Sequence, residues 1–317
     1  MARHKETLHL LREDDMSLRG VRQRRTTKQS NAKHCPERSE GSPAELKGDP
    51  SSKTRDDTSH WIASPSARND ILQKKISSCK KCPRLAKYIA SIKEKYPTYW
   101  CKPVPSFGDV NAEILIVGLA PGRFGSNRTG RMFTGDASGE FLYGTLFDVG
   151  LCNKPTSTNV NDGLILKNCY ITAVGRCAPP QNKPTPKELE NCFPYFAEEI
   201  KLLKNVKVVV ALGKIAFDGY LKWLTRHCEE GRSPDEAISL RETVRRLLRR
   251  PPRRTPRNDV LRKKDFKFSH GAIYTSKNLP HVLIASYHPS RQNTQTGRLT
   301  KKMFKQIFKK ALQYCSK

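Results

Sequence analysis

The stretch "ILIVGLAPGRFGSNRTGRMFTGDASG", residues 114–139, joins a short apolar run to a long glycine-rich loop. The last 22 residues of this stretch contain six glycines and a single acid, Asp136. A continuous apolar run of this length predicts a strand that is buried on both faces. The glycines that follow indicate a place where bare backbone approaches a ligand closely.

Three further runs are short, apolar and bounded by Gly, Pro or Asn: residues 170–174, 206–212 and 282–286. Helical patterns lie between the runs. One spans 186–204, with Thr185 as a candidate N-cap, and another spans 299–314 with an apolar stripe on one face. This alternation predicts an α/β fold, a doubly wound sandwich around a mostly parallel sheet. Ligands in such folds bind at the carboxyl ends of strands, so the glycine-rich loop and the segment after 286 should meet over one crevice.

The composition is strongly basic, with 59 Lys and Arg against 30 Asp and Glu and a net charge of +29. Such a charge indicates a polyanionic partner, either nucleic acid or an anionic membrane surface. No run of about 18 apolar residues predicts a membrane span, and no secretory signal is visible at the N-terminus. We therefore expect a cytoplasmic protein, in the bacterial cytosol or nucleoid, with no membrane partner.

Two segments differ in composition from the rest of the chain. Residues 1–68 are polar without a sustained period, and this composition predicts a disordered N-terminal arm. Residues 69–317 form the predicted domain, interrupted at about 225–262 by an arginine-rich segment. The texts "HCPERSEG" at His34 and "HCEEGRS" at His227 resemble translated repetitive elements that insert into bacterial reading frames. That resemblance implies an insertion tolerated at a loop, with arginine-rich phosphate binding as the alternative.

Four cysteines have a spacing that suits a metal. Cys79 and Cys82 form a C-x-x-C pair, and Cys177 and Cys192 enclose "CAPPQNKPTPKELENC" between a predicted strand end and a predicted helix. Two ligands on a turn and two on distant rigid elements can close an S₄ site for an iron–sulfur cluster or for zinc. The alternative is a lone C-x-x-C beside two buried thiols.

Three stretches together resemble one family: the glycine-rich loop 118–139, "CAPPQNKPTPKELENC" at 177–192 and "HPSRQNTQTGRLT" at 288–300. They are similar to the type 5 uracil-DNA glycosylases, iron–sulfur members of the uracil-DNA glycosylase superfamily. The resemblance covers about 71–223 and 266–315. It implies a three-layer α/β/α sandwich with a four-stranded, mostly parallel central sheet. It also implies excision of uracil, and of other deaminated or damaged bases, from DNA.

The resemblance further implies a [4Fe-4S] cluster on Cys79, Cys82, Cys177 and Cys192, with zinc as the alternative. Two positions depart from the related type 4 enzymes, which carry an acid where this chain has Leu119 and an Asn where it has Ala173. Both changes are typical of type 5. They leave fewer polar groups to read uracil, so a broader range of excised bases is expected.

Breaking the bond between base and sugar builds positive charge on the sugar and negative charge on the base. Asp136 is the expected catalytic carboxylate, which orients a water and faces the developing cation. An N-cap role is its alternative, because a helix is predicted just after it. His288 is the expected donor to a carbonyl oxygen of the base. The base itself would meet the Phe133 ring, whose alternative is a core anchor, and the loop backbone at Gly118, Ala120 and Gly122.

A base inside a duplex must be turned out of the stack before it can be excised. The polar segment 289–298 suits insertion into the minor groove at the resulting gap. The residues expected to contact DNA are Arg128, Arg131, Ser290, Arg291, Asn293 and Arg298. We expect a monomer that acts on DNA containing uracil or damaged bases. The alternative function is a non-catalytic nucleic-acid-binding protein with a structural metal site.

Overall fold

The structure is a computed structural model that describes residues 64–227, 266–275 and 279–316. All of them belong to one unit of the chain, His60–Lys317. The predicted arm (1–68) and insertion (225–262) lie almost wholly outside the described residues. Their described edges are helical: Pro65 begins the first helix, and His227 ends the helix that leads into the insertion. The domain boundary at residue 69 stays a prediction, and α1 begins before it, at Pro65.

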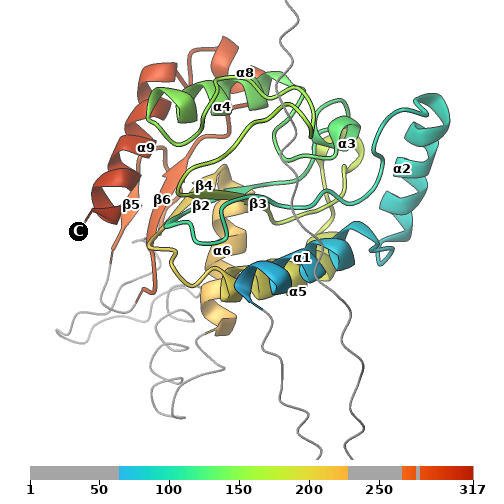
Figure 1. Ribbon diagram of the computed structural model, residues 1–317, viewed down its shortest axis with the longest axis horizontal. Coiled ribbons are helices and arrows are strands. Elements are labelled where there is room, and N and C mark those ends of the chain that lie inside the picture. The colour runs from blue at the N-terminus through green and yellow to red at the C-terminus, as the bar shows by residue number, and fades with distance from the viewer. Residues whose placement is uncertain (1–63, 228–265, 276–278, 317) are drawn as a thin grey trace, which may run out of the picture. The chain divides into compact units, whose positions relative to one another are not determined.

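A six-stranded sheet forms the centre, in the order β1-β3-β2-β4-β6-β5 (Figure 1). Its four inner strands run parallel and confirm the predicted strands to within two residues. They are β2 (Ile114–Gly118), β3 (Cys169–Ala173), β4 (Val208–Leu212) and β6 (Val282–Ser286). Two antiparallel edge strands of two residues each, β1 (Phe107–Gly108) and β5 (Ile273–Tyr274), were not predicted. A two-residue strand is too short to show any periodic pattern.

The helices are α1 (Pro65–Ser77), α2 (Pro83–Lys95), α3 (Ser126–Thr129), α4 (Ala137–Asp148), α5 (Pro186–Leu202), α6 (Lys214–His227), α8 (Arg291–Gln295) and α9 (Lys301–Cys315). A 3₁₀ turn spans Pro180–Asn182. The predicted cap of α5 is confirmed: Thr185 and Glu188 form a reciprocal capping box, with Pro186 at the first helical position. The last helix starts two residues later than predicted, after its N-cap Thr300.

Alternate strand residues face opposite sides of the sheet and build two cores. Ile116 and Val210 pack with the apolar faces of α4 and α9 on one side. Val117 and Val209 pack with α5 and α6 on the other. The predicted three-layer sandwich is thereby confirmed, with α1 beside α5 as an outer addition (Figure 1).

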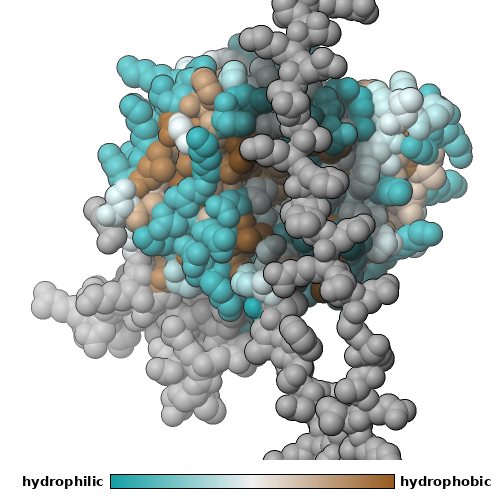
Figure 2. All heavy atoms as spheres, in the orientation of Figure 1, coloured by the Kyte–Doolittle hydropathy of each residue, from teal (hydrophilic) through white to brown (hydrophobic). Residues whose placement is uncertain are grey.

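Most of the described surface seen in Figure 2 is hydrophilic, with hydrophobic side chains gathered in smaller patches. Among the described helices, none is long and apolar enough to cross a lipid bilayer.

The strand order brings two distant loops together. The strands β2 and β6 flank β4, so the glycine-rich loop after β2 and the loop after β6 leave the sheet at the same edge. At the end of β4, Gly213 has a φ of +96°, and its N–H donates to the Ser286 carbonyl at 2.7 Å. A Cβ at Gly213 would lie 3.4 Å from the Cβ of His288. The glycine therefore permits the turn beside the loop that carries His288.

Candidate active site

Asp136 has two different environments for its two carboxylate oxygens. Its Oδ1 accepts a hydrogen bond from the Gly139 N–H at 3.0 Å, so Asp136 is the N-cap of α4 and the capping alternative is confirmed. Its Oδ2 lies against the backbone of the loop. A Cβ added at Gly122 would be 3.1 Å from that oxygen, and one at Gly125 only 2.0 Å. A side chain at position 125 would therefore clash with the Asp136 carboxylate.

The charge of Asp136 is not neutralised by an ion pair with any described residue. Burial raises the pKa of this carboxyl above its usual range, and it outweighs the opposing hydrogen bonds from the Gly139 and Ser138 backbone. The positive charge of Arg128 lowers the pKa by a smaller amount. Raised carboxyl pKa values without a charge partner are typical of functional sites rather than of structural ion pairs.

Arg128 holds the two limbs of the glycine-rich loop together. Its Nε donates to the Phe124 carbonyl and its Nη2 to the Gly135 carbonyl, both at 2.8 Å. Gly135 has a φ of +85°, and a Cβ there would lie 2.4 Å from Nη2. Two of the Arg128 donors are therefore used inside the protein, next to Asp136. The predicted contact of Arg128 with DNA would have to use its other N–H groups, and it stays a prediction.

The structure contradicts the predicted DNA contact of Arg131. The Arg131 side chain is only 5% exposed, and its Nη2 lies 2.6 Å from the Asp162 carboxylate and 2.7 Å from the Ser157 hydroxyl. Burial alone would raise the pKa of Asp162, but the Arg131 hydrogen bond and backbone N–H groups lower it well below its usual range. The guanidinium is a buried structural charge and cannot reach a phosphate.

Phe133 and His288 connect the two loops. Their ring centroids are 5.8 Å apart with an interplanar angle of 28°. The Phe133 ring also lies on the end of β2, where a Cβ at Gly118 would be 3.0 Å from two ring atoms. Only 8% of Phe133 is exposed and it belongs to the sheet core, so the core-anchor alternative is confirmed. The convergence of the two loops is as predicted; the contact of Phe133 with a base remains a prediction.

His288 is partly buried, and burial lowers its pKa to about 4. The imidazole is therefore neutral at pH 7 and keeps one N–H to donate. The loop behind it is held by Asn293, whose side-chain amide donates to the His288 carbonyl at 2.8 Å. Ser290 caps the short helix α8 and accepts from the Asn293 N–H at 3.4 Å. Ser290 and Asn293 thus position the loop, while their predicted contacts with DNA remain untested.

Arg291 and Arg298 are exposed on the same loop. The Arg298 guanidinium lies over the Tyr287 ring at 4.5 Å from its centroid. Such stacking holds a guanidinium in place and leaves its N–H groups at the surface. The contacts of both arginines with phosphates stay predictions.

The four predicted ligand cysteines come from separate elements and lie near one another. Cys79 and Cys82 precede α2, Cys177 follows β3, and Cys192 lies on α5. Burial raises the pKa of Cys177, and the neighbouring thiols of Cys192, Cys79 and Cys82 raise it further. The amide of Asn191 lies 3.4 Å from the Cys82 sulfur. Within the described part of the chain, no three His, Cys, Asp or Glu side chains are arranged to hold a single metal ion.

The sequence-based prediction did not find the buried ion pair between Arg176 and Glu199, which is next to the cysteines. These side chains are 2% and 0% exposed, and Glu199 also accepts from Thr172. Burial opposes ionisation of Glu199, but the charge of Arg176 and surrounding hydrogen bonds lower its pKa. Arg176 directly precedes Cys177, so the pair fixes that cysteine to α5. The one available signal was a charged residue between an apolar strand and a cysteine.

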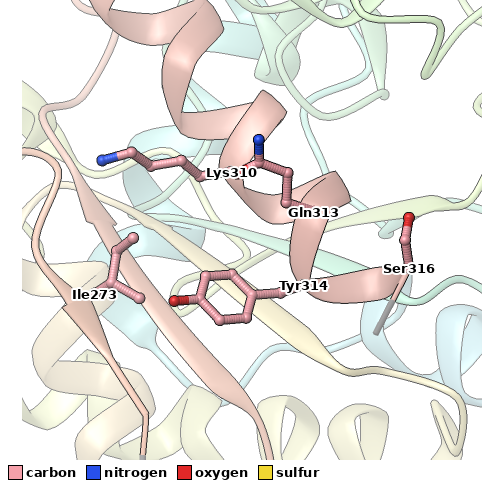
Figure 3. A pocket seen from close by; sticks show the side chains of 5 residues that line it. All are labelled: Ile273, Lys310, Gln313, Tyr314 and Ser316. Carbon is pink, nitrogen blue, oxygen red and sulfur yellow. The ribbon is translucent and has the colours of Figure 1, made fainter.

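A separate hollow of about 570 Å³ lies between α9 and β5 (Figure 3). In Figure 3 the Tyr314 side chain projects from α9 toward Ile273 on β5. The lining residues are Ile273, Lys310, Gln313, Tyr314 and Ser316. None of them belongs to the predicted site, which is built instead on the two loops that Phe133 and His288 join.

Comparison with known proteins agrees with this arrangement. Residues 105–312 match the family described as the Uracil DNA glycosylase superfamily. A type-5 uracil-DNA glycosylase from Thermus thermophilus is 43% identical over 241 residues, which cover 74% of this chain and 93% of that protein. One from Pyrobaculum aerophilum is 35% identical over 254 residues, covering 79% and 95%. A type-4 uracil-DNA glycosylase from Archaeoglobus fulgidus is 33% identical over 148 residues, covering 46% and 60%. The resemblance inferred from three motifs is confirmed, and the chain belongs to the uracil DNA glycosylase superfamily.

Proposed function

We propose that this protein is a DNA repair glycosylase that hydrolyses the N-glycosidic bond of uracil in DNA after turning the base out of the helix. The observation that carries the proposal is the meeting of two loops: Phe133 contacts His288, and the same loop holds Asp136 three residues further on. A partly buried carboxylate with a raised pKa is expensive to keep in a protein that only binds. The non-catalytic alternative is therefore disfavoured.

Asp136 acts on the sugar side of the bond. The cap to Gly139 fixes its Oδ1, and its Oδ2 stays directed toward Gly122 and Gly125. An ionised carboxylate held in this way can orient a water and stabilise the positive charge that develops on the sugar. Because no described cation neutralises it, its negative charge is available for that purpose.

His288 acts on the base side. A neutral imidazole donates one N–H to a carbonyl oxygen of the base as negative charge builds there. One such donor typically contributes about 2.7–4 kcal/mol to the transition state. The low pKa of His288 means that it stabilises the leaving base by hydrogen bonding and is not a protonated acid at pH 7.

Base and strand are held by the remaining loop groups. The extruded base contacts Phe133 and the backbone at Gly118, Ala120 and Gly122. Leu119 and Ala173 offer no polar groups that would select uracil by its edges, so other damaged bases are accepted. The segment 289–298 enters the minor groove with Ser290 and Asn293, while phosphates bind at Arg291, Arg298 and the remaining N–H groups of Arg128. We further propose that the enzyme acts as a monomer, in the bacterial cytosol or nucleoid.

We propose that Cys79, Cys82, Cys177 and Cys192 hold a [4Fe-4S] cluster, with zinc as the alternative. Zinc requires its sulfurs about 2.3 Å from one ion, whereas a cluster distributes its cysteines over separate irons. Cys79, Cys82 and Cys192 lie near enough to Cys177 to raise its pKa, while among the described residues no group of three His, Cys, Asp or Glu side chains is placed to hold a single ion. When bound, the cluster would supply a structural link between the segment before α2, the end of β3 and α5.

The cofactor is tested by composition and colour. Protein purified without oxygen should contain about four irons and four sulfides per chain and absorb visible light. Stoichiometric zinc without iron would contradict the cluster.

The activity is tested with a duplex that contains one uracil, incubated with the full chain and then treated with alkali to cleave abasic sites. Wild type should give strand breaks at the uracil, and Asp136→Ala and His288→Ala should lose most of them. Wild-type binding without breaks would favour the non-catalytic alternative. Steep weakening of binding with salt is expected in either case, because phosphates provide much of the affinity.

A further inference from the structure

Three aromatic rings form a cluster on the surface beside the glycine-rich loop. The rings of Tyr96 and Tyr99 stack at 4.7 Å, and Tyr96 meets Phe124 edge-on at 6.2 Å. Phe124 is 52% exposed and Tyr96 is 36% exposed. A single exposed aromatic residue is common on protein surfaces, but a group of contacting exposed rings indicates a binding surface.

Phe124 is attached to the catalytic part of the loop. It lies between Gly122 and Gly125, the two glycines that contact the Asp136 carboxylate. Its carbonyl accepts from the Arg128 Nε, and the same guanidinium binds the Gly135 carbonyl next to Asp136. One guanidinium thus ties the Phe124 backbone to the backbone directly before Asp136.

The other two rings are joined to the loop through the backbone. The Trp100 N–H donates to the Arg128 carbonyl at 3.0 Å, and the Cys101 N–H donates to the Asn127 carbonyl at 3.1 Å. The segment that carries Tyr96 and Tyr99 therefore forms one continuous surface with the glycine-rich loop.

The cluster is surrounded by positive charge. The Arg123 guanidinium lies over the Phe124 ring at 4.8 Å, and the Lys102 ammonium lies 5.5 Å from the Trp100 ring. Lys93 and Lys95 are exposed at the end of α2, where Glu94 is the acid between them. Exposed rings among basic side chains are the features with which proteins bind unpaired nucleotides: the rings stack on bases and the charges follow the backbone.

We propose that Phe124, supported by Tyr96 and Tyr99, is a stacking site for an unpaired base that flanks the target nucleotide in the same strand. This inference rests on the proposed function, because it is Asp136 that sets where the sugar of the target lies. A strand whose sugar is at Asp136 must continue over the neighbouring surface, and Phe124 is one residue away from Gly125. The site gives the protein affinity for single-stranded DNA beyond its phosphate contacts.

The test uses the full chain and a single-stranded oligonucleotide with an uncleavable tetrahydrofuran at the target position. The fluorescent base 2-aminopurine occupies each flanking position in turn. The variant Phe124→Leu keeps an apolar side chain but removes the ring, and Phe124→Trp keeps a ring. The matched control is Phe147→Leu, the same change at a Phe on α4 that is 45% exposed.

Stacking predicts that Phe124→Leu weakens single-stranded binding by about 5- to 100-fold, while a fully paired duplex is affected much less. Wild type and Phe124→Trp should quench 2-aminopurine at one flanking position, and Phe124→Leu should not. Unchanged single-stranded affinity in Phe124→Leu, or an equal loss in Phe147→Leu, would overturn the proposal.

Uracil excision by the same proteins separates this inference from the proposed function. Excision by wild type together with unchanged single-stranded affinity in Phe124→Leu refutes the stacking site alone. Ring-dependent binding without any excision by wild type refutes the enzyme, and it supports Phe124 only as a stacking site for single-stranded DNA, not as one that flanks an excised nucleotide.

Discussion

Asp136, within the glycine-rich loop, and Asp162, which pairs with Arg131 of that loop, have opposite electrostatic environments. Asp162 forms a buried ion pair with Arg131, and its pKa is lowered. Asp136 has no ion-pair partner among the described residues, and burial raises its pKa. Both accept hydrogen bonds from backbone N–H groups, Asp136 from Gly139 and Asp162 from Leu164. The two acids therefore differ in that only Asp162 is paired with a guanidinium, that of Arg131. Asp162 stabilises the loop, whereas the charge of Asp136 is left available for chemistry.

The two carboxylates also affect stability with opposite signs. The pKa of Asp162 is lowered by folding, so its stabilisation is present above the unfolded-state pKa and is lost as the pH falls. The pKa of Asp136 is raised by folding, so the folded state loses stability as the pH rises through that pKa. The fold is thus stabilised by ionised Asp162 and destabilised by ionised Asp136 near neutral pH.

The largest expected effect is on catalysis by Asp136→Asn. Asparagine caps a helix as well as aspartate does, and it removes the desolvated charge. We expect the single-turnover rate of uracil excision to fall about 10²- to 10⁴-fold, with a melting temperature at pH 7 equal to or above that of wild type. Near-wild-type excision by this variant would show that the comparison assigns the wrong acid to catalysis.

The next effect is on stability and comes from Asp162→Asn. Removing this carboxylate leaves the Arg131 guanidinium buried without a counter-charge, which typically destabilises a protein by about 3–5 kcal/mol. Chemical denaturation at pH 7 measures it. Glu190→Gln is the matched control, because Glu190 pairs with Lys222 and Arg226 at the surface and should contribute about 1 kcal/mol or less. Equal losses in both variants would contradict the structural role of Asp162.

His288 should contribute somewhat less than Asp136. His288→Ala is expected to lower the excision rate about 10²- to 10³-fold, since one hydrogen-bond donor to the developing charge is lost. Because its pKa is about 4, the pH profile of kcat/KM should show no inflection near 6.5. Its acid limb should instead follow Asp136, with activity lost as the pH falls through a pKa above the usual aspartate range. An inflection of the pH profile near 6.5 that disappears in His288→Ala would contradict catalysis by a neutral His288.

The smallest expected effect is on stability, and it distinguishes the helix-capping role of Asp136 from its proposed catalytic role. Asp136→Ala loses the cap to Gly139, whereas Asp136→Asn keeps it. The alanine variant should unfold about 1 kcal/mol more easily than the asparagine variant, while both lose excision to a similar extent. Equal stability of the two variants would mean that the capping bond contributes little.

The sequence predicted the elements whose signals are local. The four inner strands and α5, with Thr185 and Pro186 at its start, follow from apolar runs and capping chemistry. The edge strand Phe107–Gly108 has no such signal, because two residues cannot show a period. The start of α1 at Pro65 was not predicted, because its polar first turn resembles the segment before it.

The site was predictable only in part, and for a similar reason. Strand-end topology together with the family motifs predicted that the loops of Asp136 and His288 converge. Arg131 was assigned wrongly, because the prediction rested on its place in a glycine-rich loop and did not foresee its pairing with Asp162, 31 positions along the chain. The Arg176–Glu199 pair likewise depends on packing between β3 and α5, which local sequence does not show.

We expect the unpaired carboxylate of Asp136 to face the sugar as positive charge develops. The most direct test measures the affinity for two duplexes in which the nucleotide at the target position is replaced. One carries a cationic pyrrolidine there and the other a neutral tetrahydrofuran, and free uracil is present with each. Wild type should bind the cationic analogue much more tightly, because it resembles the charge of the transition state, and Asp136→Asn should lose that preference. An equal preference for the cationic analogue in wild type and Asp136→Asn would show that Asp136 does not stabilise the charge on the sugar.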